Sequence, residues 1–429
     1  MGEENDENIG RKPPLRFPEF REAAEWRLEP LSKLAKRRTN KNITGKHTRV
    51  LTNSAEYGVV DQRDYFEKNI ANKENLEGYY IVDKGDYVYN PRISSTAPVG
   101  PISKNRAGLG VMSPLYTVFR FNEDNNDFYA HYFKSSHWHN YLRRSSSTGA
   151  RHDRMSITNN DLMDMPLPCS TSAEQQKIAD CLSSVDELIS VETQKLDTLK
   201  TYKKGIMQHI FPRDGESVPR LRFPEFQEKG NWEEFAFSKV VTRSFYGTSN
   251  STSDSGAYPV LRMGNMVDGG LDVKNLAYID LSKREFEKIA LKKGDILLNR
   301  TNSMDLVGKI SLFDLDKNYV AASYIVTFRL DTEAIDPTYC KYFLNTSACQ
   351  EKIKGLATRA ISQANINPNS FQEKIMISLP SKLEQGRVAD YLTCLDDILT
   401  AQRQKVDALK EHKKGLMQQL FPAWDEAKI

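Results

Sequence analysis

The residues that could do chemistry in this chain are mainly basic and amide side chains gathered in a few stretches. From Leu31 to Val50 the sequence holds seven Lys or Arg residues and no acid. Seven cations without a counter-charge repel one another, so binding a polyanion such as nucleic acid would lower this electrostatic repulsion. A merely solvated surface is the competing interpretation. The candidate DNA contacts in this first basic run are Lys36, Arg37, Arg38, Lys41 and Lys46.

A second basic stretch lies between Lys134 and Arg154, where Asp153 is the single acid. The same electrostatic argument makes it a second place for a polyanionic partner. It adds Arg143 and Arg151 to the candidate DNA contacts, and Arg92 joins them from a predicted strand end.

The second half of the chain carries Arg, Asn, Gln and Ser side chains near predicted strand ends and loops. Arg pairs well with guanine edges, and Asn or Gln with adenine, so this set suits base readout in a major groove. Each residue could equally contact a phosphate or only solvent, and the sequence does not sort these roles. The candidates are Arg243, Ser249, Asn250, Arg262, Asn265, Arg300, Asn302, Arg359 and Gln363.

Motifs of catalysis and cofactor binding are incomplete. Asn90–Arg92 begins like the Asn-Pro-Pro-aromatic motif of amino-methyltransferases, but it lacks the second proline and the aromatic residue that would stack on a flipped base. Gly108–Gly110 lacks the third glycine of the dinucleotide fingerprint. His137 and His139 have no Cys or acid at metal-ligand spacing. We therefore expect a non-catalytic chain that holds no metal and no cofactor of its own.

The elements that must position these side chains occur twice. Leu15–Phe20 (Leu-Arg-Phe-Pro-Glu-Phe) recurs as Leu221–Phe226, and 18 of 39 positions are identical, without a gap, between Glu174–Pro212 and Glu384–Pro422. Such identity indicates an internal repeat.

The globular parts repeat more faintly. Three matches join them: Lys84–Asn90 with Lys293–Asn299, Phe119-Arg120 with Phe328-Arg329, and Tyr132-Phe133 with Tyr342-Phe343. One scaffold with divergent loops is what two modules that read different targets would look like. Neutral drift of exposed loops would produce the same divergence.

The strongly repeated segments have the apolar spacing of long coiled-coil helices. Polar residues interrupt the seam at the same two places in both copies, by Glu192 and Gln402 and then by Lys203 and Lys413. Polar seam residues restrict register, so we expect the two helices to pair with each other, although each could instead pack on its own domain. The seam residues are Ile178, Leu182, Val185, Ile189, Leu196 and Leu199 in the first helix and Val388, Leu392, Leu395, Leu399, Val406 and Leu409 in the second.

The length of these helices suggests a function. About 37 residues at ~1.5 Å each make a rod of roughly 55 Å. Because a globular domain precedes each helix, antiparallel pairing would place one domain at each end of the rod. The helix pair is then expected to act as a ruler between two domains.

The globular segments mix short β-branched or aromatic runs, such as Tyr79–Val82 and Tyr324–Phe328, with turns. This pattern predicts α+β domains with a curved sheet. The expected parts are an N-terminal arm (1–24), a first globular domain (25–168), a first long helix (169–212), a linker (213–230), a second globular domain (231–378), a second long helix (379–422) and a C-terminal tail (423–429).

Composition indicates a globular protein of the cytoplasm. The charged fraction is 27%, the net charge is only +3, and no apolar stretch approaches the ~18 residues of a membrane span. Met1–Gly10 is acidic and polar rather than a signal peptide. The five cysteines show neither metal-type spacing nor the even count of a disulfide framework. We therefore expect a cytoplasmic location and no membrane partner.

Several of these motifs together carry a resemblance. They are the Gly-Asp-strand-Asn elements that begin at Gly85 and Gly294, the Glu174–Ala179 segment with its helix, the Lys-Lys-Gly-Ile/Leu-Met-Gln helix ends at Lys203–Gln208 and Lys413–Gln418, and the two Leu-Arg-Phe-Pro-Glu-Phe leaders. Over nearly its whole length the chain resembles the specificity subunits of type I restriction-modification systems. The resemblance implies two target-recognition domains separated by an antiparallel pair of long coiled-coil helices, with an internal pseudo-two-fold repeat.

The resemblance also implies a function. Each recognition domain would read one half of an asymmetric bipartite site in double-stranded DNA, and the helices would set the spacer. Two modification subunits would bring S-adenosylmethionine-dependent adenine methylation. Two restriction subunits, when present, would add ATP-driven translocation and cleavage, and Mg is expected on the partner subunits. This chain would bind none of those cofactors itself.

Two other functions stay open at this point. A stand-alone DNA adenine methyltransferase with divergent motifs would bind S-adenosylmethionine as the isolated chain. A coiled-coil scaffold that holds two protein-binding domains fits the helices but explains the basic runs poorly.

Overall fold

The computed structural model describes residues 11–65, 76–146, 153–359 and 363–422. They divide into two compact units, the first formed by residues up to Glu192 together with those from Lys405 onward, and the second by Thr193–Gln404. Arg151, the expected tail 423–429 and the first ten residues of the expected N-terminal arm lie outside the described residues.

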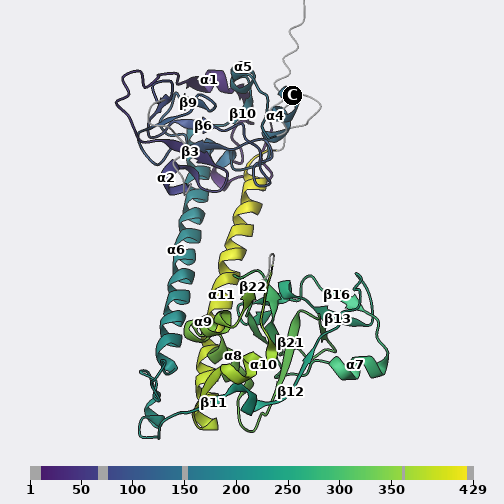
Figure 1. The fold of residues 1–429 in the computed structure, drawn as a ribbon. Helices are drawn as coiled ribbons and strands as arrows, with labels where there is room; N and C mark the ends of the chain where they lie inside the picture. Colours follow the sequence, from purple (N-terminus) through teal and green to yellow (C-terminus); the bar gives the residue numbers. More distant parts are fainter. Residues whose placement is uncertain (1–10, 66–75, 147–152, 360–362, 423–429) are drawn as a thin grey trace, which may run out of the picture. The chain divides into compact units, whose positions relative to one another are not determined.

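The first unit mixes short strands and helices around a four-stranded antiparallel sheet of order β2-β9-β6-β7 (Figure 1). The first and last strands, β1 and β10, pair and so tie the two ends of the globular segment together. Its strands are β1 Arg27–Pro30, β2 Ala35–Arg37, β3 Leu51–Ser54, β4 Gly58–Asp61, β5 Tyr80–Val82, β6 Tyr87–Tyr89, β7 Ile102–Lys104, β8 Gly110–Met112, β9 Thr117–Phe121 and β10 Pro166–Cys169. Its short helices are η1 Pro18–Phe20, α1 Leu31–Leu34, α2 Gln62–Tyr65, α3 Asp127–Tyr132, α4 His139–Ser145 and α5 Asn159–Met163.

The second unit has a four-stranded antiparallel sheet of order β12-β21-β17-β19. Again the outermost strands of the globular segment, β11 and β24, pair with each other. The strands are β11 Glu233–Ala236, β12 Val241–Tyr246, β13 Tyr258–Leu261, β14 Met266–Val267, β15 Gly270–Leu271, β16 Ala277–Ile279, β17 Ile296–Asn299, β18 Thr301–Asn302, β19 Ile310–Leu312, β20 Val320–Ala321, β21 Ile325–Leu330, β22 Thr358–Arg359, β23 Ala364–Asn365 and β24 Met376–Leu379. The short helices are η3 Pro224–Phe226, η4 Phe237–Val240, η5 Met263–Asn265, α7 Lys283–Ile289, α8 Pro337–Leu344, α9 Ser347–Gly355 and α10 Pro368–Lys374. Strands and helices are mixed in both units, as the α+β prediction requires.

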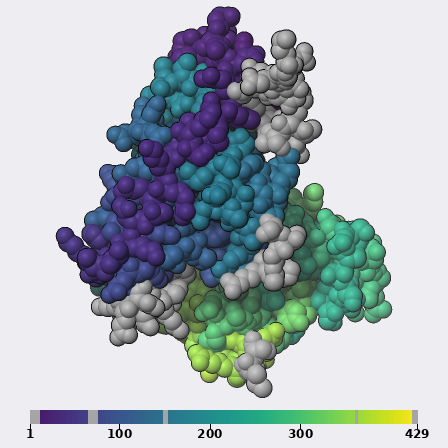
Figure 2. All heavy atoms as spheres, turned by 90° about the horizontal axis from the view of Figure 1, so that it is seen from above, coloured from purple at the N-terminus to yellow at the C-terminus, as the bar shows by residue number. Residues whose placement is uncertain are grey.

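Buried aromatic and aliphatic side chains hold each sheet against the helices of its own unit. In the first unit Trp26, Phe119 and Phe128 are almost fully buried, and in the second Phe328 and Phe371 stack with ring centroids 5.3 Å apart. Each such side chain contributes about 1.5–3 kcal/mol relative to an exposed one. Segments from the first 170 residues, coloured purple to blue, intermingle over the outer surface of the first unit (Figure 2).

Two long helices, α6 (Ser172–Ile210) and α11 (Lys382–Leu420), each contribute a segment to both units. The Thr171 hydroxyl accepts a hydrogen bond of 3.3 Å from the first turn of α6, at the amide of Glu174. Each helix ends directly before a Phe-Pro pair, because proline disfavours a helical residue before it. With 39 residues each, both helices have a length of roughly 58 Å.

The first leader joins the ends of both long helices within the first unit. The Arg16 guanidinium donates to both carboxylate oxygens of Glu174 in α6, at 2.6 and 2.8 Å, and Trp26 Nε1 donates to the same carboxylate at 3.1 Å. The Leu15 amide donates to the carbonyl of Gln419 in α11 at 2.9 Å. The leader thus connects the start of one helix to the end of the other.

The second leader makes the same contacts within the second unit, with the helices exchanged. Arg222 donates to both oxygens of Glu384 in α11 at 2.8 and 2.9 Å, and Trp232 Nε1 donates at 3.2 Å. The Leu221 amide donates to the carbonyl of His209 in α6 at 2.9 Å.

In the described part of the chain, no helix is both long enough and apolar enough for a bilayer crossing.

Candidate nucleic-acid interface

An ion pair with a buried carboxylate joins two strands of the main sheet in each unit. In the first unit Asp86 accepts from Arg120 Nε at 2.6 Å, and in the second Asp295 accepts from Arg329 Nε and Nη2 at 2.9 and 2.7 Å. These residues belong to the faint motif matches, so each pair brings two matched motifs together. Burial raises the pKa of Asp86, and Arg120 opposes that shift.

The first basic run lies along β2 and the loop after it. Lys36, Lys41 and Lys46 are exposed, and none of them forms an ion pair with a described residue. Arg37 is half-buried. Arg38 donates to Asp83 at 3.0 Å, so its charge is partly neutralised within the unit. The three lysines are therefore the members best placed to meet a polyanion.

The other candidates of the first unit lie on different elements. Arg92 is exposed and pairs through its backbone with Arg154, whose side chain has an ion pair of 3.4 Å with Asp153. Arg143 is exposed on α4 and donates to Asn140 Oδ1 at 3.0 Å.

In the second unit the structure gathers several candidates on one small three-stranded sheet, of order β18-β23-β22. Asn302 lies on β18, Arg359 on β22, and Gln363 directly before β23. Arg300 directly precedes β18, and its Nε and Nη2 donate to Asn365 Oδ1 on β23 at 3.1 and 3.0 Å. We call this group, with Asn365, the β18–β23 cluster.

Other candidates of the second unit surround the main sheet. Ser249 and Asn250 are exposed in the segment after β12. Arg243 lies on β12 with its guanidinium 4.7 Å from the ring centroid of Phe245, and it donates to the carbonyl of Lys288 at 2.6 Å. Its position on the sheet is therefore fixed by its neighbours.

Asn265 has a structural environment. Its side chain is almost buried, its Oδ1 accepts from the Arg262 amide at 2.8 Å, and its Nδ2 donates to the carbonyls of Asp272 and Asn275 at 2.8 and 3.2 Å. These bonds leave the amide little capacity to read a base. Arg262 itself is exposed, with one bond of 3.4 Å to the Asn275 carbonyl.

Two residues outside the candidate set belong to the same surface. Tyr246, at the end of β12, is 48% exposed and lies under the Arg300 guanidinium, 5.1 Å from ring centroid to charge. Asn365 holds the same guanidinium from the side. An aromatic residue at the end of a predicted strand was the available signal for Tyr246, but the candidates were chosen among Lys, Arg, Asn, Gln and Ser residues.

The predicted seam residues are buried or half-buried in the structure. Seven are buried, namely Ile178, Leu182, Leu196, Val388, Leu392, Leu395 and Val406. Five are half-buried, namely Val185, Ile189, Leu199, Leu399 and Leu409.

The seam lysines meet carboxylates of the other helix. In the first unit Lys413 donates to Asp186 at 2.5 Å, and in the second Lys203 donates to Asp396. Tyr342 also donates to Asp396, at 2.6 Å. In the first unit Lys405 also donates to Glu192 at 2.6 Å, so a later residue of α6 meets an earlier residue of α11 and the two helix segments run antiparallel there.

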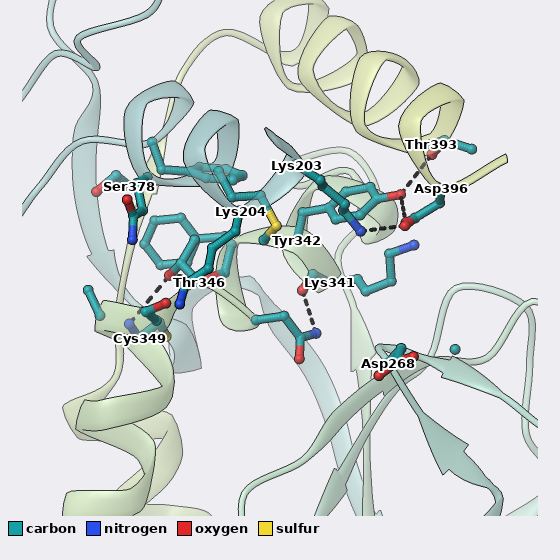
Figure 3. Close-up of a pocket in the computed structure, with 18 of the residues that line it drawn as sticks. Lys203, Lys204, Asp268, Lys341, Tyr342, Thr346, Cys349, Ser378, Thr393 and Asp396 are labelled. Carbon is teal, nitrogen blue, oxygen red and sulfur yellow. Dashed lines mark hydrogen bonds and ion pairs between the residues drawn. The ribbon is translucent and has the colours of Figure 1, made fainter. Parts of the chain in front are cut away.

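The Lys203–Asp396 pair lines an open cleft of about 1830 Å³ in the second unit (Figure 3). Lys341 faces the same cleft, and burial lowers the pKa of its amine. The hairpin β14–β15 forms another wall and places Asp268 within 3.7 Å of Arg403 on α11. Acidic and basic residues alternate along the walls, so the cleft has no single sign of charge.

Among the described residues, no group of three or more His, Cys, Asp or Glu side chains could hold a metal ion. All five cysteines are free thiols.

A protein family described as the type I restriction modification DNA specificity domain matches residues 27–201 and again residues 230–411. The chain is 23% identical to the type I restriction enzyme MjaVIII specificity subunit of Methanocaldococcus jannaschii over 97% of this chain and 95% of that one. It is 24% identical to the EcoKI specificity subunit of Escherichia coli over 66% of this chain. The chain spans 60% of the length of the EcoKI subunit and 41% of the length of MjaX, a further relative in M. jannaschii.

A similar fold occurs in the crystal structure of a type I restriction-modification system S subunit from M. genitalium. The TM-score is 0.55 at 13% sequence identity, with 96% of this chain and 100% of that chain covered.

Proposed function

Because this chain belongs to the family of type I restriction modification DNA specificity domains, we propose that it is the DNA sequence-specificity subunit of a type I restriction-modification complex. The observation that carries the proposal is the double match, once over residues 27–201 and once over residues 230–411. The names of its relatives, which are specificity subunits of type I restriction enzymes, support it.

We infer that each globular segment reads one half of an asymmetric bipartite site in double-stranded DNA. Exposed lysines in the first unit and the β18–β23 cluster in the second support this reading, since cations hold the phosphate backbone and Arg or Asn side chains read base edges. The two sets differ in residue type and in the element that carries them. An asymmetric site is the expected result.

We further infer that α6 and α11 form an antiparallel coiled coil whose length sets the spacer between the half-sites. The burial of the seam residues and the Lys203–Asp396 and Lys413–Asp186 pairs support this inference. An internal pseudo-two-fold repeat would explain why both leaders make the same contacts. The lysines would then select a single register, since a shifted helix would leave a buried charge unpaired.

We propose that the chain is non-catalytic and acts with two modification subunits and two restriction subunits. In that assembly S-adenosylmethionine, ATP and Mg would bind to the partner subunits. This chain would supply the DNA sequence preference and the distance between the two half-sites, by binding and orienting the duplex.

The test is to combine the purified chain with its modification subunits and to map methylation on a random DNA library. Methylation at one bipartite sequence with a fixed spacer is the expected result. Binding should also weaken steeply with salt, because phosphate contacts release counterions. Methylation of one contiguous half-site, or methylation by the isolated chain, would overturn the proposal.

A further inference from the structure

Arg300 differs from Arg359, the other cation of the β18–β23 cluster, in how firmly its side chain is held. Asn365 Oδ1 accepts from both Nε and Nη2, at 3.1 and 3.0 Å, and the Tyr246 ring lies against the guanidinium at 5.1 Å. The backbone is fixed as well, because the Arg300 amide donates to the Tyr324 carbonyl at 3.0 Å and the Ile366 amide donates to the Arg300 carbonyl at 2.8 Å. The guanidinium therefore has a defined position before any ligand arrives.

The charge of Arg300 meets a neutral group within its own unit. Its hydrogen-bond partner is a neutral amide, and no carboxylate in the described part of the chain forms an ion pair with it. Arg38 and Arg329, by contrast, are paired with Asp83 at 3.0 Å and with Asp295 at 2.7 Å. Fixing a full positive charge at a half-exposed position without a carboxylate is useful only if the partner comes from outside.

The geometry also leaves a particular edge of the guanidinium available. The group carries five N–H donors in a planar fork. Asn365 takes the Nε donor and the Nη2 donor beside it, so the end edge, with one N–H on Nη2 and one on Nη1, stays open. Two parallel N–H donors at this spacing match the O6 and N7 acceptors of guanine in the major groove.

We propose that Arg300 reads a guanine in the half-site of the second unit, and that Asn365 and Tyr246 are its positioning residues. This inference rests on the function proposed above and deepens it. A side chain that is already ordered loses less conformational entropy on binding, so its preference for one base edge is expressed more fully. A phosphate contact needs no such arrangement.

Arg359 supplies the matched control on the same small sheet. It is exposed on β22, and its side chain makes no hydrogen bond or ion pair with a described residue. Such a side chain fits a phosphate contact, which supports affinity for every sequence alike.

The first unit has a different residue at the corresponding place. In the matched motifs Arg300 follows Asn299, whereas Pro91 follows Asn90, and proline offers no side-chain donor. The predicted guanine preference therefore belongs to one half-site only.

The experiment compares methylation motifs of complexes formed with the modification subunits. The full chain is used in the wild-type form and as R300A, R300K, N365A and R359A, each on a random DNA library. R300A should relax one guanine position in one half-site, with discrimination lower by about 5- to 150-fold, the factor that corresponds to ~1–3 kcal/mol. R300K, which keeps the charge but lacks the fork, should relax the same position, and N365A should do so more weakly. R359A should lower methylation of all sequences alike.

The inference is overturned if R300A and R300K leave every position unchanged, or if both lower methylation uniformly as R359A does. Relaxation in both half-sites, or at a position without a G·C pair, would also contradict it. If the wild-type complex shows no bipartite motif at all, the proposed function fails and this inference fails with it. That outcome is distinct, because it is seen before any variant is compared. Thermal unfolding of N365A at the wild-type temperature would show that its effect comes from positioning rather than from lost folding.

Discussion

The two units share their buried charges and differ in their exposed ones. Arg16 with Glu174 in the first unit and Arg222 with Glu384 in the second make the same bidentate contact at a helix start. At the expected DNA surface, however, the first unit has lysines along β2 and the loop after it that form no ion pair with a described residue, whereas the second unit holds Arg300 directly before a strand of a small sheet. We call the two leader contacts, Arg16 with Glu174 and Arg222 with Glu384, the frame, and the exposed candidate DNA contacts the reading surface. The contrast indicates that the frame and the reading surface are under separate physical constraints.

The reason lies in the cost of changing each kind of residue. Removing one partner of a buried pair leaves an uncompensated charge and costs about 3–5 kcal/mol. Most exposed substitutions change stability by only about 0.5 kcal/mol. Exposed side chains can therefore change their target without changing the fold. We therefore predict that the length of the two long helices, the free energy of unfolding and the DNA sequence preference can each be altered without changing the other two.

The largest effect should follow a change in the length of both helices. Insertion of one heptad between Glu192 and Thr193 and another between Gln404 and Lys405 adds about 10 Å, or roughly three base pairs of DNA. The Lys203–Asp396 and Lys413–Asp186 pairs keep their registers, because each lies on one side of the insertions. Mapping of methylation should give two unchanged half-sites and a spacer longer by about three base pairs.

A heptad in α6 alone is the control for that experiment. It would shift one helix past the other and separate the paired charges, so we expect loss of stability rather than a new spacer. A changed half-site in the double insertion would show that frame and reading surface are not independent.

The next effect concerns the buried carboxylates at the helix starts. Glu174→Ala should leave the Arg16 charge and the Trp26 indole N–H without their partner, and Glu384→Ala should do the same to Arg222 and Trp232. Each change should lower the free energy of unfolding by about 3–5 kcal/mol, measured by chemical denaturation.

The exposed pair of Glu19 with Lys177, at 3.2 Å, is the matched control on the same helix. Glu19→Ala should leave the free energy of unfolding almost unchanged, because solvent screens an exposed ion pair. If Glu174→Ala and Glu384→Ala differed by more than that control, the two frames would not be energetically alike.

Much of this fold could be predicted from the sequence because its signals are local and repeated. Apolar spacing located both long helices, and alternating β-branched and aromatic runs indicated an α+β fold. The leader motif was visible as a repeat, but its contact with the helix starts was not, since Arg16 and Glu174 are 158 positions apart. Nothing local in the sequence reports which distant residue a buried guanidinium will meet.

The candidate site was less predictable for the same reason. A run of lysines and arginines looks uniform in the sequence, yet Lys36 is exposed while Arg38 is paired with Asp83. By residue type alone, Asn265 and Arg300 were equally good candidates for base readout. In the structure, however, the Asn265 amide is hydrogen-bonded to backbone groups, whereas one edge of the Arg300 guanidinium stays available. Exposure and partners depend on chain segments that lie far apart in the sequence.

A smaller difference between the units is the expected effect of low pH on their stability. In the first unit His131 is buried against α6, with Nε2 3.0 Å from Ser183 Oγ and Nδ1 3.9 Å from Asp186, and Lys134 and Lys413 lie close to the same carboxylate. Burial, aided by the two lysines, lowers the pKa of His131 to about 4. The matched position in the second unit is occupied by Lys341 rather than by a histidine, so the His131 imidazole has no counterpart there.

The first unit should therefore lose stability in mild acid and the second should not. The folded pKa of His131 lies below its unfolded value of about 6.5, so the unfolded chain binds the extra proton and stability falls as the pH drops from about 6.5 toward 4. The loss approaches roughly 3 kcal/mol at the lower end of that window.

Hydrogen exchange measured by mass spectrometry at pH 7 and pH 5 should show faster opening of α3 and β9 than of α8 and β21, after correction for the intrinsic rate. In His131→Gln this difference should shrink, because no proton can be taken up at that position. Equal acid sensitivity of both units in the wild-type chain would show that the charges around Asp186 and Asp396 respond alike, and that the histidine is not the cause.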